Sequence, residues 1–232
     1  MLLRTTENRQ LTTNNSLRSA LTRAAAQLDA SPHLRADAPR DALVLLLHTT
    51  GLTRAAFHAN PDRPLPPDQS FTYDAAIRRR LTHEPIQYIT GEQEFYGLTL
   101  HVTPAVLIPR PETEHLVEAV LAELKQAELD PAAPLRILDV GTGSGAIAIA
   151  LAHHLPDAHI TATDISPAAL EVAAANAARH HVTNQIHFLE SDLLSELQAN
   201  PAPHSSRSDE RDRQAPAFTR EARREQYEVP RR

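Results

Sequence analysis

Apolar residues recur at three- and four-residue steps near the start of the chain, a spacing that predicts an amphipathic helix. The recurring positions are Leu17, Leu21, Ala24, Ala25 and Leu28. Asn15 or Ser16 stands where such a helix needs an N-cap, because a short polar side chain there can accept a hydrogen bond from the first turn.

Two further helices follow the same rule. One is predicted over residues 41–50, where Gly51 is a typical C-terminal signal, and another over residues 73–82, after the proline-rich stretch 61–67. We therefore expect a helical domain over residues 1–83.

Between residues 85 and 106 the apolar positions begin to alternate and aromatic residues appear, which is typical of strands. The aromatic residues are Tyr88, Phe95 and Tyr96. We expect a strand pair in a linker over residues 84–114, followed by a helix over residues 116–129.

From residue 135 to residue 190 the pattern runs strand, glycine-rich loop, helix, strand, helix, strand. This alternation is typical of a parallel sheet in an α/β fold, and we expect this domain to cover residues 115–200.

Residues 201–232 differ sharply, with 8 arginines, 4 prolines and neither leucine nor isoleucine. Such a segment buries too little apolar area to fold. It is either a disordered tail or a frameshifted reading frame, and the half-built sheet upstream favours the frameshift.

Composition narrows the class of protein. The formal charge of -6 argues against broad binding to nucleic acid or to an anionic membrane. The chain has no cysteine, which excludes disulfides and thiolate chemistry, and its apolar runs are too short to span a bilayer. Adjacent histidine pairs do not share a helix face, so no metal site is expected. A cytoplasmic monomer is the expectation.

The strongest chemical signal is the glycine loop, Gly141, Thr142, Gly143, Ser144 and Gly145, between an apolar strand and a helix. Glycines let the backbone turn tightly and let a ligand approach without interference from a Cβ. We expect the N–H groups of the loop and the positive end of the helix to face that ligand.

Polar residues at the ends of the next two strands identify the ligand. Asp164 is placed to accept hydrogen bonds from both ribose hydroxyls of a nucleoside, and Asp192, with Leu193, to contact an adenine. The glycine spacing differs from that of dinucleotide binders, so S-adenosylmethionine is the predicted cofactor. The alternative for either aspartate is a helix cap.

Several motifs resemble those of the release-factor glutamine methyltransferases. They are EPIQYITG at residues 84–91, EFYG at 94–97, LIPRPETE at 107–114, the glycine loop and ATDIS at 162–166. The resemblance covers residues 17–194. It implies a helical domain, a β-hairpin linker and a Rossmann-like class I methyltransferase domain, here incomplete. It also implies S-adenosylmethionine as cofactor and release factors as protein substrates. Arg110 and Glu112 would lie at the mouth of the active site. The alternative is a capped entry to the helix that follows, with Thr113 as N-cap and Glu114 near its positive end, and the two interpretations are compatible.

The family's catalytic Asn-Pro-Pro-Tyr motif does not occur in this sequence. The nearest match, Asn200-Pro201-Ala202-Pro203, lacks the aromatic residue and follows no apolar strand, so we expect no catalytic residue from it. Three functions stay open. They are a glutamine methyltransferase for release factors, an inactive remnant that only binds S-adenosylmethionine or a release factor, and a glutamine methyltransferase for a ribosomal protein.

Overall fold

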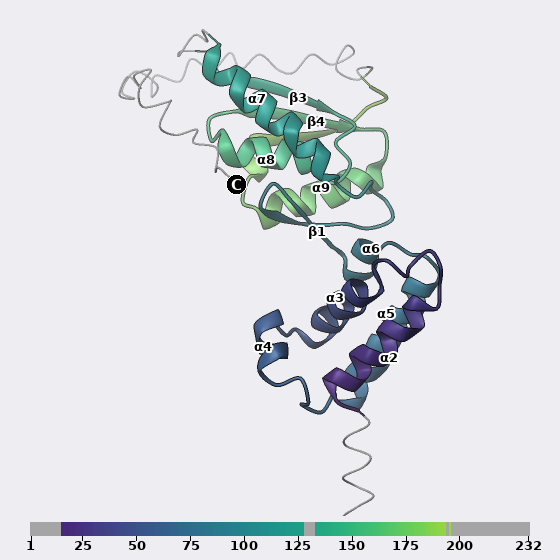
Figure 1. Cartoon of the computed structure of the whole chain (residues 1–232). Coiled ribbons are helices and arrows are strands. Elements are labelled where there is room, and N and C mark those ends of the chain that lie inside the picture. Colours follow the sequence, from purple (N-terminus) through teal and green to yellow (C-terminus); the bar gives the residue numbers. More distant parts are fainter. Residues whose placement is uncertain (1–14, 128–132, 194, 196–232) are drawn as a thin grey trace, which may run out of the picture. The chain divides into compact units, whose positions relative to one another are not determined.

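The computed structural model describes residues 15–127, 133–193 and 195. The chain divides after Gly91 into two compact units, a helical one and one built on a parallel sheet (Figure 1). The predictions for Asn200 and for residues 201–232 lie outside the described residues. Within those residues no helix has the length and apolar character that crossing a membrane requires.

The helical unit contains α2 (Leu17–Asp29), α3 (Ala38–Thr50), α4 (Arg54–Ala59), α5 (Pro67–Leu81) and α6 (Ile86–Thr90). Leucines from α2 and α3 form its core with Tyr73 of α5, whose hydroxyl donates to the carbonyl oxygen of Ala42 at 2.9 Å. The three helices predicted from the spacing are confirmed. Two of them begin earlier than expected, because a proline in the first turn starts α3 and α5.

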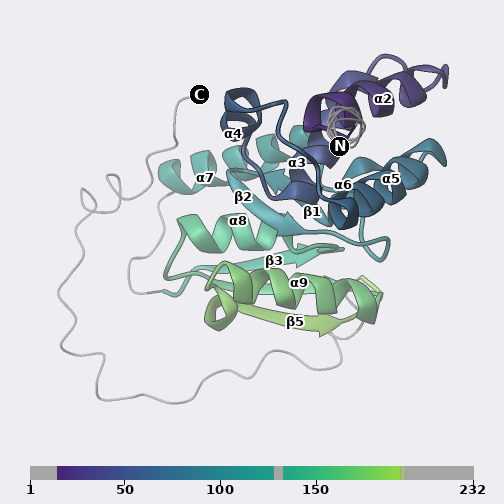
Figure 2. The same cartoon turned by 90° about the horizontal axis from the view of Figure 1, so that it is seen from below.

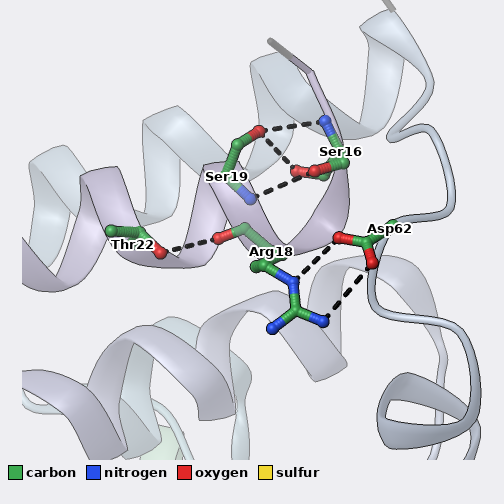
Figure 3. Close-up of polar contacts among 5 residues, drawn as sticks. All are labelled: Ser16, Arg18, Ser19, Thr22 and Asp62. Carbon is green, nitrogen blue, oxygen red and sulfur yellow. Dashed lines mark hydrogen bonds and ion pairs between the residues drawn. The ribbon is translucent and has the colours of Figure 1, made fainter. Parts of the chain in front are cut away.

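The start of α2 is fixed by the predicted cap residue (Figure 3). The hydroxyl of Ser16 accepts from the N–H of Ser19 at 3.2 Å, and the Ser19 hydroxyl accepts from the N–H of Ser16 at 3.0 Å. Arg18 then forms an ion pair with Asp62 on the loop beside it, Nε to Oδ1 at 2.8 Å. Asn15 does not cap α2; its amide donates to the carbonyl oxygen of Leu65.

A buried ion pair joins α3 to α5. Nε of Arg80 donates to Oδ2 of Asp41 at 2.7 Å, and the two side chains are 15% and 2% exposed. Arg80 also donates to the carbonyl oxygen of Glu84 at 3.1 Å. Asp41 is therefore a charge in the helical core whose compensation depends on Arg80.

Residues 85–106, which were expected to form only strands, begin with a helix. Tyr88 lies in α6, whose Ile86 and Ile89 are both buried at a helical spacing of three. The hairpin itself is confirmed as β1 (Glu92–Phe95) and β2 (Leu98–His101), which pair antiparallel. Tyr96 and Gly97 have φ of 52° and 76° and form its two-residue turn.

The second unit carries the parallel sheet, with strands β3 (Arg136–Val140), β4 (His159–Asp164) and β5 (Ile186–Glu190) in the order β3-β4-β5. Val140 pairs with Thr163 and Asp164 pairs with Glu190, so the carboxyl ends of the strands lie in register. This is the parallel α/β sheet predicted from the sequence.

Helices α7 (Glu114–Gln126), α8 (Ala146–His154) and α9 (Pro167–Arg179) bury one face of this sheet. They can be followed in Figure 2. Ile160 and Ala162 of β4 point into that core and are almost fully buried. Leu138 and Val140 alternate with the core positions of β3 and are 45% and 42% exposed. Among the described strands, β3 lies at an edge of the sheet.

Candidate cofactor-binding site

The glycine loop leaves β3 and enters α8. Its glycines Gly141, Gly143 and Gly145 have φ of 75°, 55° and 81°, values that L side chains rarely adopt. A Cβ on Gly141 or Gly143 would meet no atom within 4 Å, whereas one on Gly145 would lie 2.9 Å from Cδ1 of Ile149. Gly145 therefore serves the packing of α8, and the space beside the other two is open.

The prediction that the N–H groups of the loop face a ligand is wrong for four of its five residues. The amides of Gly141 and Thr142 both donate to the carbonyl oxygen of Thr163 at 2.8 Å. Gly145 donates to Thr142 at 2.9 Å and Gly143 donates to the Asp164 carboxylate. These bonds fix the loop to the end of β4, so its shape is set without a ligand.

Asp164 lies at the carboxyl end of β4. Its Oδ2 accepts from the N–H of Gly143 at 2.9 Å, and its Oδ1 accepts from the N–H of Ser166 at 3.0 Å. The alternative of a helix cap is wrong, because the hydroxyl of Ser166 caps α9 by accepting from Ala169. A carboxylate oxygen accepts more than one hydrogen bond, so both oxygens of the half-buried Asp164 can take another.

A second carboxylate, Asp139 in β3, lies behind the loop and was not singled out from the sequence. It is 9% exposed, and its Oδ2 accepts from the hydroxyl of Thr142 at 2.7 Å. Burial raises the pKa of Asp139, hydrogen bonds from Thr142 and from the backbone of Ala148 lower it, and the charge of Asp164 raises it; the net shift is upward. The available signal was an acidic residue between two apolar residues of the strand, Leu138 and Val140.

The raised pKa of Asp139 predicts a pH-dependent stability. The folded state holds this proton more tightly than the unfolded state does, so protonated Asp139 contributes to the free energy of unfolding. This stability is lost as the pH rises from about 4 through the folded-state pKa. Asp139→Asn should remove this loss of stability, because asparagine does not titrate. The free energy of unfolding of the variant, relative to that of the wild type, should therefore increase as the pH rises. Urea denaturation across this range measures the difference. A difference that does not change with pH would contradict the assignment, and Asp157→Asn, at an exposed position, is the control.

The remaining predicted cofactor residues lie in two environments. Thr142 and Ser144 are buried, so their side chains point into the protein. Asp192 and Leu193, just past the end of β5, are exposed. Ile165, which follows Asp164, is 66% exposed and adds an apolar surface that the sequence reading missed.

Arg110 and Glu112 are exposed at the short 3-10 helix η1 (Pro111–Thr113) that precedes α7. Thr113 stands at the N-cap position of α7, but its side chain makes no capping bond, so that part of the alternative is wrong. Oε1 of Glu114 accepts instead from the N–H of Tyr96 at 3.0 Å and holds the turn of the hairpin.

Comparison with known proteins agrees with this arrangement. Residues 19–91 match the family described as PrmC N-terminal domain, and residues 137–205 match a methyltransferase domain. The latter match and the parallel sheet confirm the predicted fold class.

Three relatives of this chain, from different bacteria, share the same name. The release factor glutamine methyltransferase of Koribacter versatilis is 48% identical over 188 residues, 81% of this chain and 62% of the relative. That of Escherichia coli is 46% identical over 177 residues, 76% of this chain and 60% of the relative. That of Moorella thermoacetica is 44% identical over 187 residues, which are 81% of this chain and 62% of the relative. The chain thus spans about three fifths of the length of these relatives. By its two domain matches and these relatives, the chain is similar to the release factor glutamine methyltransferases over about three fifths of their length.

Proposed function

We propose that the sheet-bearing unit binds S-adenosylmethionine at the carboxyl ends of β3, β4 and β5, and that this binding serves methyl transfer to a glutamine side-chain amide of peptide chain release factors. One observation carries the first part. The carboxylate of Asp164 lies at a strand end and accepts a hydrogen bond from Gly143 of the glycine loop, and a Cβ on Gly143 would meet no atom within 4 Å.

The residues at this edge fit the cofactor. Open space beside Gly141 and Gly143 admits a ligand close to the backbone, and the two oxygens of Asp164 suit the ribose hydroxyls. The exposed Ile165 after β4 offers an apolar surface for the base, and Asp192 and Leu193 are exposed just past the end of the neighbouring strand β5. The carboxylates of Asp139 and Asp164 favour a ligand that carries positive charge.

The cofactor supplies an activated methyl group, and the acceptor is an amide nitrogen whose lone pair is delocalised into its carbonyl. A catalytic site must therefore accept both N–H protons and aim the nitrogen. Asn-Pro-Pro-Tyr, the motif expected to do so, does not occur in the 232 residues. This observation favours a second candidate function, in which the chain by itself binds the cofactor, or a release factor, without transferring the methyl group.

Two measurements test these proposals. Calorimetric titration with S-adenosylmethionine should show binding to the wild-type chain and none to Gly143→Val, because a branched side chain would fill the open space at a strained φ. Equal affinity in the two would refute the cofactor site. A radiolabel assay then compares transfer to a release factor with transfer to a ribosomal protein.

We expect this chain by itself to transfer the methyl group at a rate several orders of magnitude below that of a full-length relative, with either substrate. Turnover comparable to the relative's would refute the second candidate. Labelling of the ribosomal protein alone would refute the proposed substrate. Cytoplasmic location, a monomeric state and the roles of Arg110 and Glu112 at the mouth of the site stay predictions.

A further inference from the structure

A fully buried amide on α9 lies between the glycine loop and the hairpin. Asn176 is 0% exposed. Its Oδ1 accepts from the N–H of His101 at 2.7 Å, and its Nδ2 donates to the carbonyl oxygens of His101 and Ser144, both at 2.9 Å. One side chain thus contacts two segments that are far apart in the sequence.

These partners fix the orientation of the amide. His101 presents an N–H and a C=O, and Asn176 satisfies both, as a neighbouring strand would do at this end of β2. The remaining hydrogen of Nδ2 is directed at Ser144. Breaking any one of these bonds leaves a buried polar group unsatisfied, at a cost of about 1–3 kcal/mol.

The loop contact reaches the candidate ligand site directly. Ser144 follows Gly143, whose N–H is bound by Asp164. Asn176 holds the carbonyl of Ser144, and Asp164 holds the amide one residue earlier. The two side chains therefore fix the peptide groups on either side of the Gly143–Ser144 peptide, one from α9 and the other from β4.

Two other contacts join α9 and its C-cap to the hairpin without touching the loop. Nη2 of Arg179 pairs with Oε1 of Glu92 at 2.8 Å, and Nε2 of His180 lies 2.9 Å from the carbonyl oxygen of Thr99. Both contacts are exposed. They support the hairpin as Asn176 does, but they give it no connection to the ligand site.

We propose that Asn176 is a positioning residue that couples the glycine loop to the hairpin, so that a ligand in the loop stabilises the hairpin and the hairpin supports the ligand. The coupling rests on the proposed cofactor function and is reciprocal.

The test is residue-level hydrogen exchange with S-adenosylhomocysteine as the probe. If opening of the hairpin disturbs the loop, a ligand at 100 times its Kd slows exchange of the His101 amide by up to about 100-fold. We expect a slowing of at least about tenfold in the wild type. Unchanged exchange of His101 in a chain that binds the ligand would overturn the coupling, and this arm needs no variant.

Variants then assign the coupling to Asn176. Asn176→Ala should weaken ligand binding about tenfold or more and abolish the slowing at His101, while amides of the β4–β5 pair remain protected. Arg179→Ala is the matched control, and it should keep both the affinity and the slowing. Asn176→Ala with wild-type affinity and slowing would refute the inference. Failure of the wild type to bind the ligand would instead refute the cofactor site.

Discussion

Replacing Asp164 with alanine is expected to abolish measurable binding of S-adenosylmethionine, with Kd raised at least about 100-fold. The substitution removes the proposed acceptors of two ribose hydroxyls, and hydrogen bonds to a charged group contribute about 1.5–3 kcal/mol each. It also removes the acceptor of the Gly143 amide, so the loop itself loses a contact at 2.9 Å. Isothermal titration calorimetry measures the effect.

Two comparisons separate ligand contact from loss of structure. Asp164→Asn keeps one carboxyl-like oxygen and should bind with intermediate affinity. Asp157→Ala changes an exposed aspartate that precedes the amino end of β4 and should bind normally. If Asp164→Ala binds like the wild type, the cofactor lies elsewhere. Amide protection in β4 and β5 shows whether the sheet has survived.

The largest expected loss of stability comes from Arg80→Met in the helical unit. It leaves the Asp41 carboxylate, 2% exposed, without its partner at 2.7 Å. Removing one member of a buried ion pair costs about 3–5 kcal/mol, far more than an exposed pair contributes. The loss should appear as faster hydrogen exchange of the core amides of α3 and α5, and as a lower urea midpoint for the helical unit.

The same carboxylate provides the control. Arg40 also approaches Asp41, with Nε 3.7 Å from Oδ1, but its side chain is 64% exposed. Arg40→Met should therefore cost less than about 1 kcal/mol. Combining Arg80→Met with Asp41→Asn should restore part of the lost stability, because the second substitution removes the uncompensated charge. A loss below about 1 kcal/mol in Arg80→Met alone would show that water reaches Asp41 after all.

The long amphipathic helices and the parallel strands could be predicted because their patterns extend over several turns or a full βαβ unit. Two short helices could not. Residues 54–59 form α4 and residues 86–90 form α6, and elements of this length hold too few periodic positions to be told from a loop or strand. Ile86 and Ile89 stabilise α6 because both are buried in the core, and Gly91 ends this helix with a φ of 75°.

The site shows the same division. The glycine loop and Asp164 could be identified because a strand end, a tight turn and a carboxylate follow one another locally. The hydrogen bonding of the loop amides could not, since it depends on how β4 lies beside β3 and brings Thr163 to Gly141. Asn176 stands in mid-helix among alanines, and its partners appear only after the hairpin has been placed.

The strand order β3-β4-β5 also has a consequence for the route by which the chain folds. Arg136 pairs with His159 and Ile160 pairs with Ile186, so each ladder closes only after a whole helical crossover has formed. The contacts of α2 with α3 and α5 need no such parallel crossover. The hairpin then joins α9 across 75 residues, from His101 to Asn176, which is farther than the 48 residues between the paired Ser16 and Pro64 of the helical unit. High contact order slows folding, so we expect the helical unit to collapse first and the sheet-bearing unit to complete its packing in the slower kinetic phase.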